Sequence, residues 1–228
     1  KSIGSCSKGC GGRTRHERIA KEHMSTTIVH LIRHGEVHNP EKILYGRLPG
    51  YRLSTRGRNQ AARTATSLRG HDVVYLAASP LQRAQETAQP CAHTFNLGIV
   101  VDEGLIEAGN QLEGLRVRGW RSQLWNPVRW PMLRDPSLPS WGEHYTDIAE
   151  RMMDSVERAR LEAEGHEAVL VSHQLPIVCV QRAVMELPLA HNPGSRQCDL
   201  ASVTSLVFHD EVITDIYYTE PAREKRHA

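Results

Sequence analysis

The sequence has no marked excess of charge of either sign. Its 228 residues contain 28 lysines and arginines against 26 aspartates and glutamates, which gives a formal net charge of +2 at pH 7. Proteins that bind nucleic acid or anionic membranes mainly through charge carry a clear positive excess. The balance here gives no support for either kind of binding, so we expect no nucleic-acid partner and no membrane partner.

Long apolar runs are also missing. No stretch approaches the roughly 20 apolar residues that a membrane-spanning helix needs, and the first residues lack the apolar centre of a secretory signal. The hydrophobic fraction of 39% and the charged fraction of 24% are ordinary for a globular domain. We therefore expect one sizeable domain with its own core, located in the cytoplasm.

Cysteines are few, odd in number and scattered, which argues against a disulfide framework. They are Cys6, Cys10, Cys91, Cys179 and Cys198. Cys179 lies in "PIVCV" and is typical of a small buried hydrophobic residue. Cys6 and Cys10 precede His16 and His23, which leaves a zinc site as an alternative. The gap from Cys10 to His16 is, however, too short for the hairpin and helix of a zinc finger.

Residues 1–23 are rich in glycine, serine and basic residues and have no apolar periodicity. We expect a disordered leader, followed by a domain that spans residues 24–228, with Met24 a plausible true start. An arginine-rich transit peptide is the alternative, although the glycines disfavour an amphipathic helix. Deletion of residues 1–23 is expected to leave stability and activity unchanged.

From residue 26 onward, short apolar runs alternate with helical patterns. Strands are predicted at 26–32, 72–78, 97–101 and 166–172, with a closing hairpin at 201–208 and 212–218. Helices are predicted at 53–70 with Ser54 or Thr55 as the N-cap, at 79–95 with Ser79 as the N-cap, at 144–165 and at 175–187. The alternation predicts an α/β fold with an open, mostly parallel sheet covered on both faces and an antiparallel edge.

Residues 109–143 interrupt this alternation. The segment has little periodicity, and it holds four prolines and all four tryptophans of the chain, namely Trp120, Trp125, Trp130 and Trp141. One interpretation is a small satellite core beneath a long connection. The other is a Trp- and Pro-rich insertion that forms a lid or wall near the active site.

Polar side chains follow three of the predicted strands. Arg33 and His34 end the first, Arg83 lies in the first turn of the helix after the second, and His173 ends the fourth. Ligands of open parallel sheets bind outside the carboxyl ends of the strands. Guanidinium groups and helix N-termini suit phosphate oxygens, so the sequence predicts an anion site at this edge.

A competing hypothesis uses the spacing of His30, His34 and His38. On a helix this spacing of four would place the three imidazoles on one face, as metal ligands often are. The run "TTIVHLI" favours a strand instead, and on a strand His38 lies in the loop beyond. His30 is then expected to be a core or edge histidine.

Three segments in order, "LIRHGE", "SPLQRAQETA" and "VLVSH", resemble the motifs of the histidine phosphatase superfamily, also called the phosphoglycerate mutase-like family. The resemblance covers Met24 to Tyr218. It implies a three-layer α/β/α sandwich, which agrees with the alternation of strands and helices.

The resemblance also implies roles for individual residues. His34 would be the nucleophile that takes the phosphoryl group, and Arg33, Arg83 and His173 would bind its oxygens, so that neither a metal ion nor a cofactor is needed. Asn39 is matched to the asparagine of the "RHGExxxN" pattern and would touch the phosphate, although it comes one residue early because only Val37 and His38 separate it from Glu36.

The general acid has two candidates in "LIEAGNQLEG". Glu107 is preferred because it directly follows the third strand region, and an acid must protonate the leaving alkoxide. The spacing from Glu107 to Glu113 is one residue shorter than in the common family form, so Glu113 stays an alternative. A second departure is "SHQLP", where Gln174 replaces the usual glycine and could add a side-chain contact.

The expected function is hydrolysis of small phosphorylated metabolites through a phosphohistidine. Glu107 and His173 are only 66 positions apart, a shorter interval than the mutase insertion usually occupies. The segment "YGRLPGYRLSTRG" also lacks the Trp- and Asp-containing text that mutases commonly show. Phosphoglycerate mutase activity and a non-catalytic phosphate-binding module stay as alternatives, and a homodimer is an open possibility.

Overall fold

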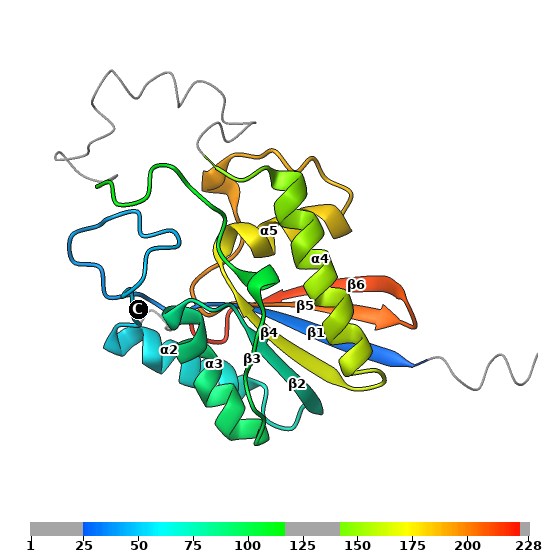
Figure 1. Ribbon diagram of the computed structural model, residues 1–228. Coiled ribbons are helices and arrows are strands. Elements are labelled where there is room, and N and C mark those ends of the chain that lie inside the picture. The colour runs from blue at the N-terminus through cyan, green and yellow to red at the C-terminus, as the bar shows by residue number, and fades with distance from the viewer. Residues whose placement is uncertain (1–24, 117–141, 224–228) are drawn as a thin grey trace, which may run out of the picture.

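The computed structural model describes residues 25–116 and 142–223 (Figure 1). Several expectations concern segments outside these ranges: the leader with Cys6, Cys10, His16 and His23, and the four tryptophans of the 109–143 insertion. Within the described residues, no helix has the length and the apolar character that crossing a membrane requires.

Among the described residues, six strands form one sheet in the order β3-β2-β4-β1-β5-β6. The strands are β1 (Thr26–Arg33), β2 (Val73–Ala78), β3 (Val100–Val101), β4 (Glu167–Ser172), β5 (Val203–His209) and β6 (Val212–Thr219). β1 to β4 run parallel to one another, whereas β5 and β6 add an antiparallel edge beside β1. The predicted α/β class and the mostly parallel sheet are confirmed.

In the ranges that the structure describes, two helices cover each face of the sheet, which gives the three layers that the resemblance implied (Figure 1). α2 (Thr55–Ser67) and α3 (Gln82–Phe95) pack on one face, and α4 (Tyr145–Glu162) and α5 (Gln174–Val184) pack on the other. The central strand β4 sends Ala168 and Leu170 to one core and Val169 and Val171 to the other. Burial on both faces explains why its sequence is a continuous apolar run.

Two predicted boundaries are wrong. α3 begins at Gln82 with Leu81 as its N-cap, not at Ser79. The hydroxyl of Ser79 is engaged instead by His173 Nε2, at 2.8 Å. β3 has two residues where five were predicted, because only Val100 and Val101 pair with β2. By contrast, α2 begins as predicted, and the Ser54 hydroxyl accepts a hydrogen bond from the Gly57 amide at 3.0 Å.

The carboxyl ends of β1 and β4 meet at one edge of the sheet. Arg33 pairs with Ser172 in the parallel register, so the residues that follow, His34 and His173, leave the sheet together. The His34 amide donates to the Ser172 carbonyl at 3.0 Å, which extends the ladder by one bond. The fold therefore brings together two histidines that are separated by more than half of the chain.

Candidate active site

His34 lies just beyond β1 and is only 2% exposed. Its Nδ1 is 2.8 Å from the Gly35 carbonyl oxygen. A carbonyl oxygen can only accept, so Nδ1 carries a proton, and in the neutral ring Nε2 keeps its lone pair. The local backbone therefore selects the tautomer that a nucleophilic histidine needs.

The surroundings of His34 also keep its ring neutral. Burial lowers the pKa of His34 well below its ordinary value, and the positive charges of Arg83 and Arg33 lower it further. The hydrogen bond to Gly35 acts in the opposite direction and is the smallest of these effects. A neutral imidazole at position 34 is thus the ground state at neutral pH.

Three buried nitrogens of the candidate site have no hydrogen-bond partner in the part of the chain that the structure describes. Among the described residues, the buried side-chain nitrogen and oxygen atoms that lack a hydrogen bond are Arg33 Nε, Arg83 Nε and His173 Nδ1. Leaving such a group unpaired costs about 1–3 kcal/mol, and folded proteins rarely tolerate it without a purpose. All three belong to residues predicted to bind a phosphoryl group, and together they can donate to one tetrahedral anion.

The two guanidinium groups are held by backbone carbonyls. Arg33 Nη1 donates to Cys198 O at 2.6 Å, and Arg83 Nη2 donates to Gly46 O at 2.7 Å. Arg83 is 1% exposed, and its guanidinium carbon lies 4.8 Å from the centre of the Tyr45 ring. Fixed in this way, each fork keeps further N–H groups for an anionic ligand without a loss of side-chain entropy on binding.

His173 faces His34, with their ring centres 5.2 Å apart. Its Nε2 lies 2.8 Å from the hydroxyl of the fully buried Ser79, which fixes the ring orientation. Burial is the main cause that lowers the pKa of His173 well below its ordinary value, followed by the charge of Arg83. Ser79 is a site residue that the sequence analysis missed, since its position before a helix suggested a cap.

Glu107 lies at the wall of the cavity, and its Oε1 accepts a hydrogen bond from the Ala108 amide at 2.9 Å. Burial raises its pKa above the ordinary value, although this hydrogen bond and the charges of Arg83 and Arg33 oppose the rise. Glu113 is placed differently, because its Oε1 accepts from the Arg47 amide at 2.9 Å and packs against Gly46. Its observed contacts hold the turn that carries Tyr45 and Gly46.

A network of ion pairs holds the backbone around Glu107. Arg47 Nε donates to the Glu107 carbonyl at 2.6 Å, and Arg47 Nη2 pairs with Glu143 at 2.7 Å. Glu143 also accepts from the Gly109 amide at 3.2 Å and pairs with Arg151 at 2.8 Å. These contacts place Glu107 without using its carboxylate.

Asn39 also lines the cavity, but its amide group is engaged by its own loop. Its Nδ2 donates to the Ile43 carbonyl at 2.8 Å, and its Oδ1 accepts from the Ile43 amide at 3.1 Å. The observed role of Asn39 is therefore to close the loop at 39–43, and its contact with phosphate stays a prediction.

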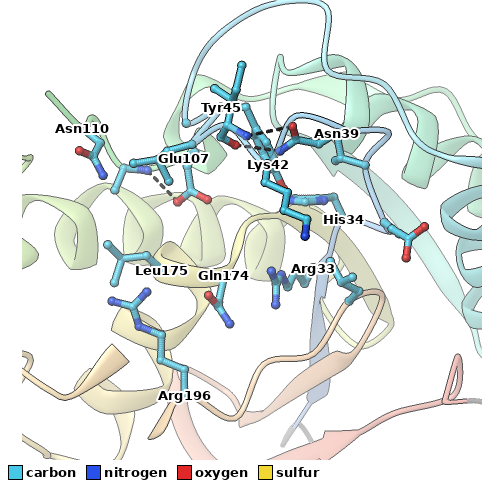
Figure 2. Close-up of a pocket in the computed structure, with 17 residues that line it drawn as sticks. Arg33, His34, Asn39, Lys42, Tyr45, Glu107, Asn110, Gln174, Leu175 and Arg196 are labelled. Atoms are coloured by element: carbon cyan, nitrogen blue, oxygen red, sulfur yellow. Dashed lines mark hydrogen bonds between the residues drawn. The ribbon is translucent and has the colours of Figure 1, made fainter. Parts of the chain in front are cut away.

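The cavity above His34 has a volume of about 540 Å³, which suits a small organic ligand. Lys42, Gln174 and Arg196 line it in addition to the expected residues, and Lys42 and Arg196 extend into it from loops (Figure 2). No motif marks these two cations in the sequence, so they could not be found without the fold. Gln174, by contrast, was expected to be close to the site.

The structure does not assemble the three-histidine group of the alternative hypothesis. β1 is a strand through His30, and the backbone of His38 pairs with Arg52 in the following loop. His30 lies with His71 and Glu167 instead, away from His34.

Comparison with known proteins agrees with this geometry. A family model described as the histidine phosphatase superfamily (branch 1) matches residues 29–215. The chain belongs to the histidine phosphatase superfamily. The uncharacterized protein Rv0525 of Mycobacterium tuberculosis is 50% identical to it over 196 residues, which are 86% of this chain and 97% of that protein.

Other members of the histidine phosphatase superfamily are more distant. The mycobacterial glucosyl-3-phosphoglycerate phosphatase Rv2419c superposes with a TM-score of 0.62 at 26% identity, over 81% of this chain and 91% of that one. The probable phosphoglycerate mutase GpmB of Shigella boydii is 27% identical over 77% of this chain and 83% of that protein. Phosphatases and mutases both transfer phosphoryl groups, so phosphoryl transfer is the shared chemistry of these relatives.

Proposed function

We propose that the protein is a phosphomonoester hydrolase that works through a phosphohistidine at His34 and needs no metal ion. The observation that carries the proposal is a set of three buried nitrogens that have no hydrogen-bond partner among the described residues, Arg33 Nε, Arg83 Nε and His173 Nδ1. They accompany a histidine, His34, whose tautomer leaves Nε2 unprotonated. Donors fixed before the substrate arrives stabilise charge on phosphoryl oxygens with little reorganisation.

In the first step, His34 Nε2 attacks phosphorus while the bond from phosphorus to the ester oxygen breaks. Glu107, whose raised pKa favours the protonated carboxyl, gives its proton to the departing oxygen, and an alcohol leaves. During the transfer, the oxygens of the phosphoryl group are bound by Arg33, Arg83 and His173. Ser79 is a positioning residue: its O–H donates to His173 Nε2 and so keeps the His173 proton on Nδ1.

In the second step, water attacks the phosphohistidine from the side that the alcohol has left. The Glu107 carboxylate takes a proton from this water, which returns the acid to its starting form. The N–P bond breaks, inorganic phosphate is released, and His34 regains its neutral ring. Lewis-acid assistance is not required, since two arginines supply the positive charge.

The cavity favours a substrate whose organic part is also negatively charged. Lys42 and Arg196 line the cavity beyond the phosphate donors, and the charge of Arg196 acts on Glu107. The relative at 26% identity is a phosphatase whose substrate name contains a phosphoglycerate group. Small phosphorylated metabolites with a carboxylate are therefore the preferred class.

Mutase activity is the second candidate, because two curated Shigella boydii relatives have the name probable phosphoglycerate mutase. Hydrolysis and transfer share the same first step, so the fate of the phosphoryl group separates them. We expect release of inorganic phosphate from several carboxylated phosphomonoesters. In an assay with 3-phosphoglycerate and bisphosphoglycerate, efficient formation of 2-phosphoglycerate would show that the protein is a mutase and not a hydrolase.

The intermediate can be trapped directly. After incubation with a phosphomonoester and quenching, we expect a phosphoenzyme that is labile in acid and stable in base, and that is absent from His34→Ala. His38→Ala is the matched control, since His38 does not line the cavity, and it should keep both the intermediate and turnover. Turnover that survives in His34→Ala would overturn the mechanism, as would a loss of turnover in chelator that a divalent ion restores.

A further inference from the structure

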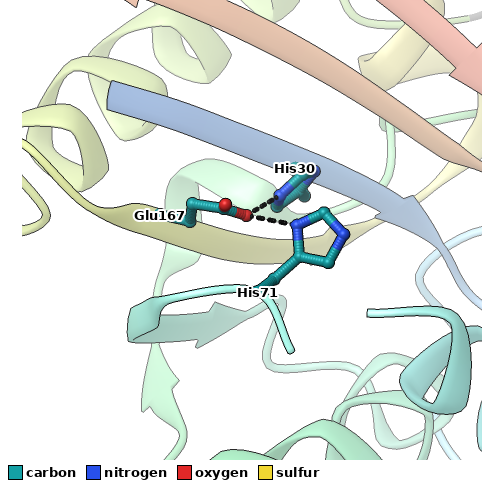
Figure 3. Close-up of side chains that lie close together, drawn as sticks. All are labelled: His30, His71 and Glu167. Carbon is teal, nitrogen blue, oxygen red and sulfur yellow. Dashed lines mark hydrogen bonds and ion pairs between the residues drawn. The ribbon is translucent and has the colours of Figure 1, made fainter. Parts of the chain in front are cut away.

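A second cluster of ionisable side chains lies at the other end of β4. His30 comes from the middle of β1, Glu167 is the first residue of β4, and His71 lies in the connection between α2 and β2 (Figure 3). Ser172 and His173 at the opposite end of β4 belong to the candidate active site. The phosphoryl-transfer mechanism uses none of the three clustered residues.

One carboxylate oxygen joins the two imidazoles. Glu167 Oε2 lies 2.7 Å from His30 Nε2 and 2.8 Å from His71 Nδ1. The two rings meet edge to face with their centres 5.5 Å apart, and the three ligand atoms all lie within 4.8 Å of one another. Within residues 25–116 and 142–223, this is the one group of three or more histidine, cysteine, aspartate or glutamate residues with such a spacing.

The far side of the His30 ring is already supported. His30 Nδ1 lies 2.8 Å from the hydroxyl of Ser205 on β5. Metal-binding histidines usually donate their second ring N–H to such a partner, which directs the other nitrogen to the metal. His30 is 3% exposed, whereas the side chain of His71 is 40% exposed, so the group is closed toward the sheet and open toward solvent.

The backbone next to two of the three residues is also fastened. Asp72 follows His71 in the sequence. The Glu167 amide donates a hydrogen bond to the Asp72 carbonyl oxygen at 3.0 Å. The Asp72 carboxylate pairs with His166 at 2.6 Å. The connection that carries His71 is thus tied to the start of β4 by contacts that do not involve the clustered side chains.

We propose that His30 Nε2, His71 Nδ1 and Glu167 Oε2 bind a divalent transition-metal ion, with Zn²⁺ the best match. Two imidazoles and one carboxylate form a donor set typical of zinc, and the open side leaves a fourth position for water. On binding, the proton of His30 Nε2 moves by way of solvent to Nδ1, which then donates to Ser205. The proton of His71 Nδ1 likewise moves to its solvent-facing nitrogen.

The geometry requires a small adjustment. Tetrahedral zinc with bonds of about 2.0–2.1 Å keeps its ligand atoms about 3.3 Å apart. The carboxylate oxygen must therefore separate from each imidazole by roughly half an ångström, by rotation of the Glu167 and His71 side chains about the buried His30. The two imidazole nitrogens, which lie within 4.8 Å of one another, must reach the same spacing, and His71 can move because its side chain is 40% exposed. A bound ion would connect β1, β4 and the α2–β2 connection, so its effect is on stability and not on phosphoryl transfer.

Zinc titration of the full chain tests the proposal. The assay uses the Cys6→Ser, Cys10→Ser background, which removes the two thiols outside the described residues as competing ligands. We expect calorimetry to show one site that His71→Ala and Glu167→Gln weaken at least tenfold, and we expect Zn²⁺ to raise Tm in the background protein but not in these two variants. His93→Ala, which removes an exposed histidine on α3, should bind like the background.

Two further measurements keep the test decisive. Co²⁺ in place of Zn²⁺ should give the d–d absorption of a four-coordinate site without thiolate bands, and His71→Ala should abolish it. Phosphatase activity in His71→Ala should equal that of the background, which shows that the variant is folded and that the two sites are independent. Equal zinc affinity in the background, His71→Ala and Glu167→Gln proteins would overturn the proposal and leave a hydrogen-bonded cluster.

Discussion

At the residue scale, His34 and Glu107 have pKa values displaced in opposite directions. Burial lowers the pKa of His34 below its ordinary value and raises that of Glu107 above its own. The proposed first step needs a neutral His34, which exists above its lowered pKa. It also needs a protonated Glu107, which exists below its raised pKa. Environment thus separates the two groups into a base and an acid.

This separation predicts the pH dependence of kcat/KM, which reports the groups of the free enzyme. We expect a maximum on the acid side of neutrality and a fall as the pH rises through the raised pKa of Glu107. The acid limb should lie well below pH 6.5, the ordinary value for histidine. An acid limb near pH 6.5 would show that His34 titrates as an exposed histidine.

The role of Glu107 can be separated from a structural one by the leaving group. A general acid contributes about 10²–10⁴-fold, and mostly when the departing oxygen is basic. Glu107→Gln should therefore lose about that factor with an alkyl phosphate, much less with p-nitrophenyl phosphate, and should lose the alkaline limb of the pH profile. Glu113→Gln should reduce the rate of hydrolysis by the same ratio for both substrates, because Glu113 supports a turn. The reverse pattern would make Glu113 the acid.

Most residues of the candidate site could be found from the sequence because they follow strand ends. Parallel strands deliver their following residues to one edge, so Arg33, His34 and His173 were placed together by the strand pattern alone. Lys42 and Arg196 could not be found, since each comes from an irregular loop whose path depends on distant contacts. Ser79 was seen but misjudged, because its partner, His173, is remote in sequence.

At the scale of elements, α2 presses directly on the loop after His34. A Cβ atom at Gly35 would lie 2.6 Å from the Gly57 carbonyl oxygen, and one at Gly57 would overlap the Glu36 carbonyl oxygen. Because Gly35 and Gly57 have no side chain, the first turn of α2 can contact the backbone at Gly35, whose carbonyl accepts the hydrogen bond from His34 Nδ1. The close approach couples the position of α2 to the tautomer of His34.

Gly57→Ala should separate α2 from this loop. We expect the free energy of unfolding to fall by about 1–3 kcal/mol, as for other overpacked contacts, and kcat to fall with it because the Gly35 carbonyl moves. Gly98→Ala is the control, since a Cβ atom at Gly98 meets nothing within 4 Å. Denaturant unfolding and steady-state kinetics measure both effects, and an unchanged Gly57→Ala protein would contradict the coupling.

The helices and strands were predicted largely correctly because each has a clear period or a continuous apolar run. The errors fall where tertiary contacts override local signals. Ser79 and Pro80 have the composition of a helix start, yet the chain stays extended there and α3 begins at Gln82. Residues 97–99 have the composition of a strand, but pairing with β2 begins only at Val100.

At the scale of the whole molecule, an anion bound at His34 should stabilise the fold. A ligand that binds only the native state raises the free energy of unfolding by about 2.7 kcal/mol at 100 times its Kd. We expect Tm to rise with inorganic phosphate, and the rise to be lost in Arg33→Met. Arg158→Met should keep it, because Arg158 pairs with Asp102 in an exposed ion pair outside the cavity lining. An equal rise in both variants would indicate nonspecific salt effects.

The position of β4 has a consequence for folding during translation. β4 lies between β1 and β2, and it is made after both. A growing polypeptide that has emerged from the ribosome as far as α4 therefore has His34 and Glu107, but it has no strand to join the two earlier strands. The sheet closes, and His173 arrives beside His34, only when residues 167–173 have been translated. A chain that ends before residue 173 therefore lacks the second histidine of the candidate site, and the Cys198 carbonyl that holds Arg33 is added later still.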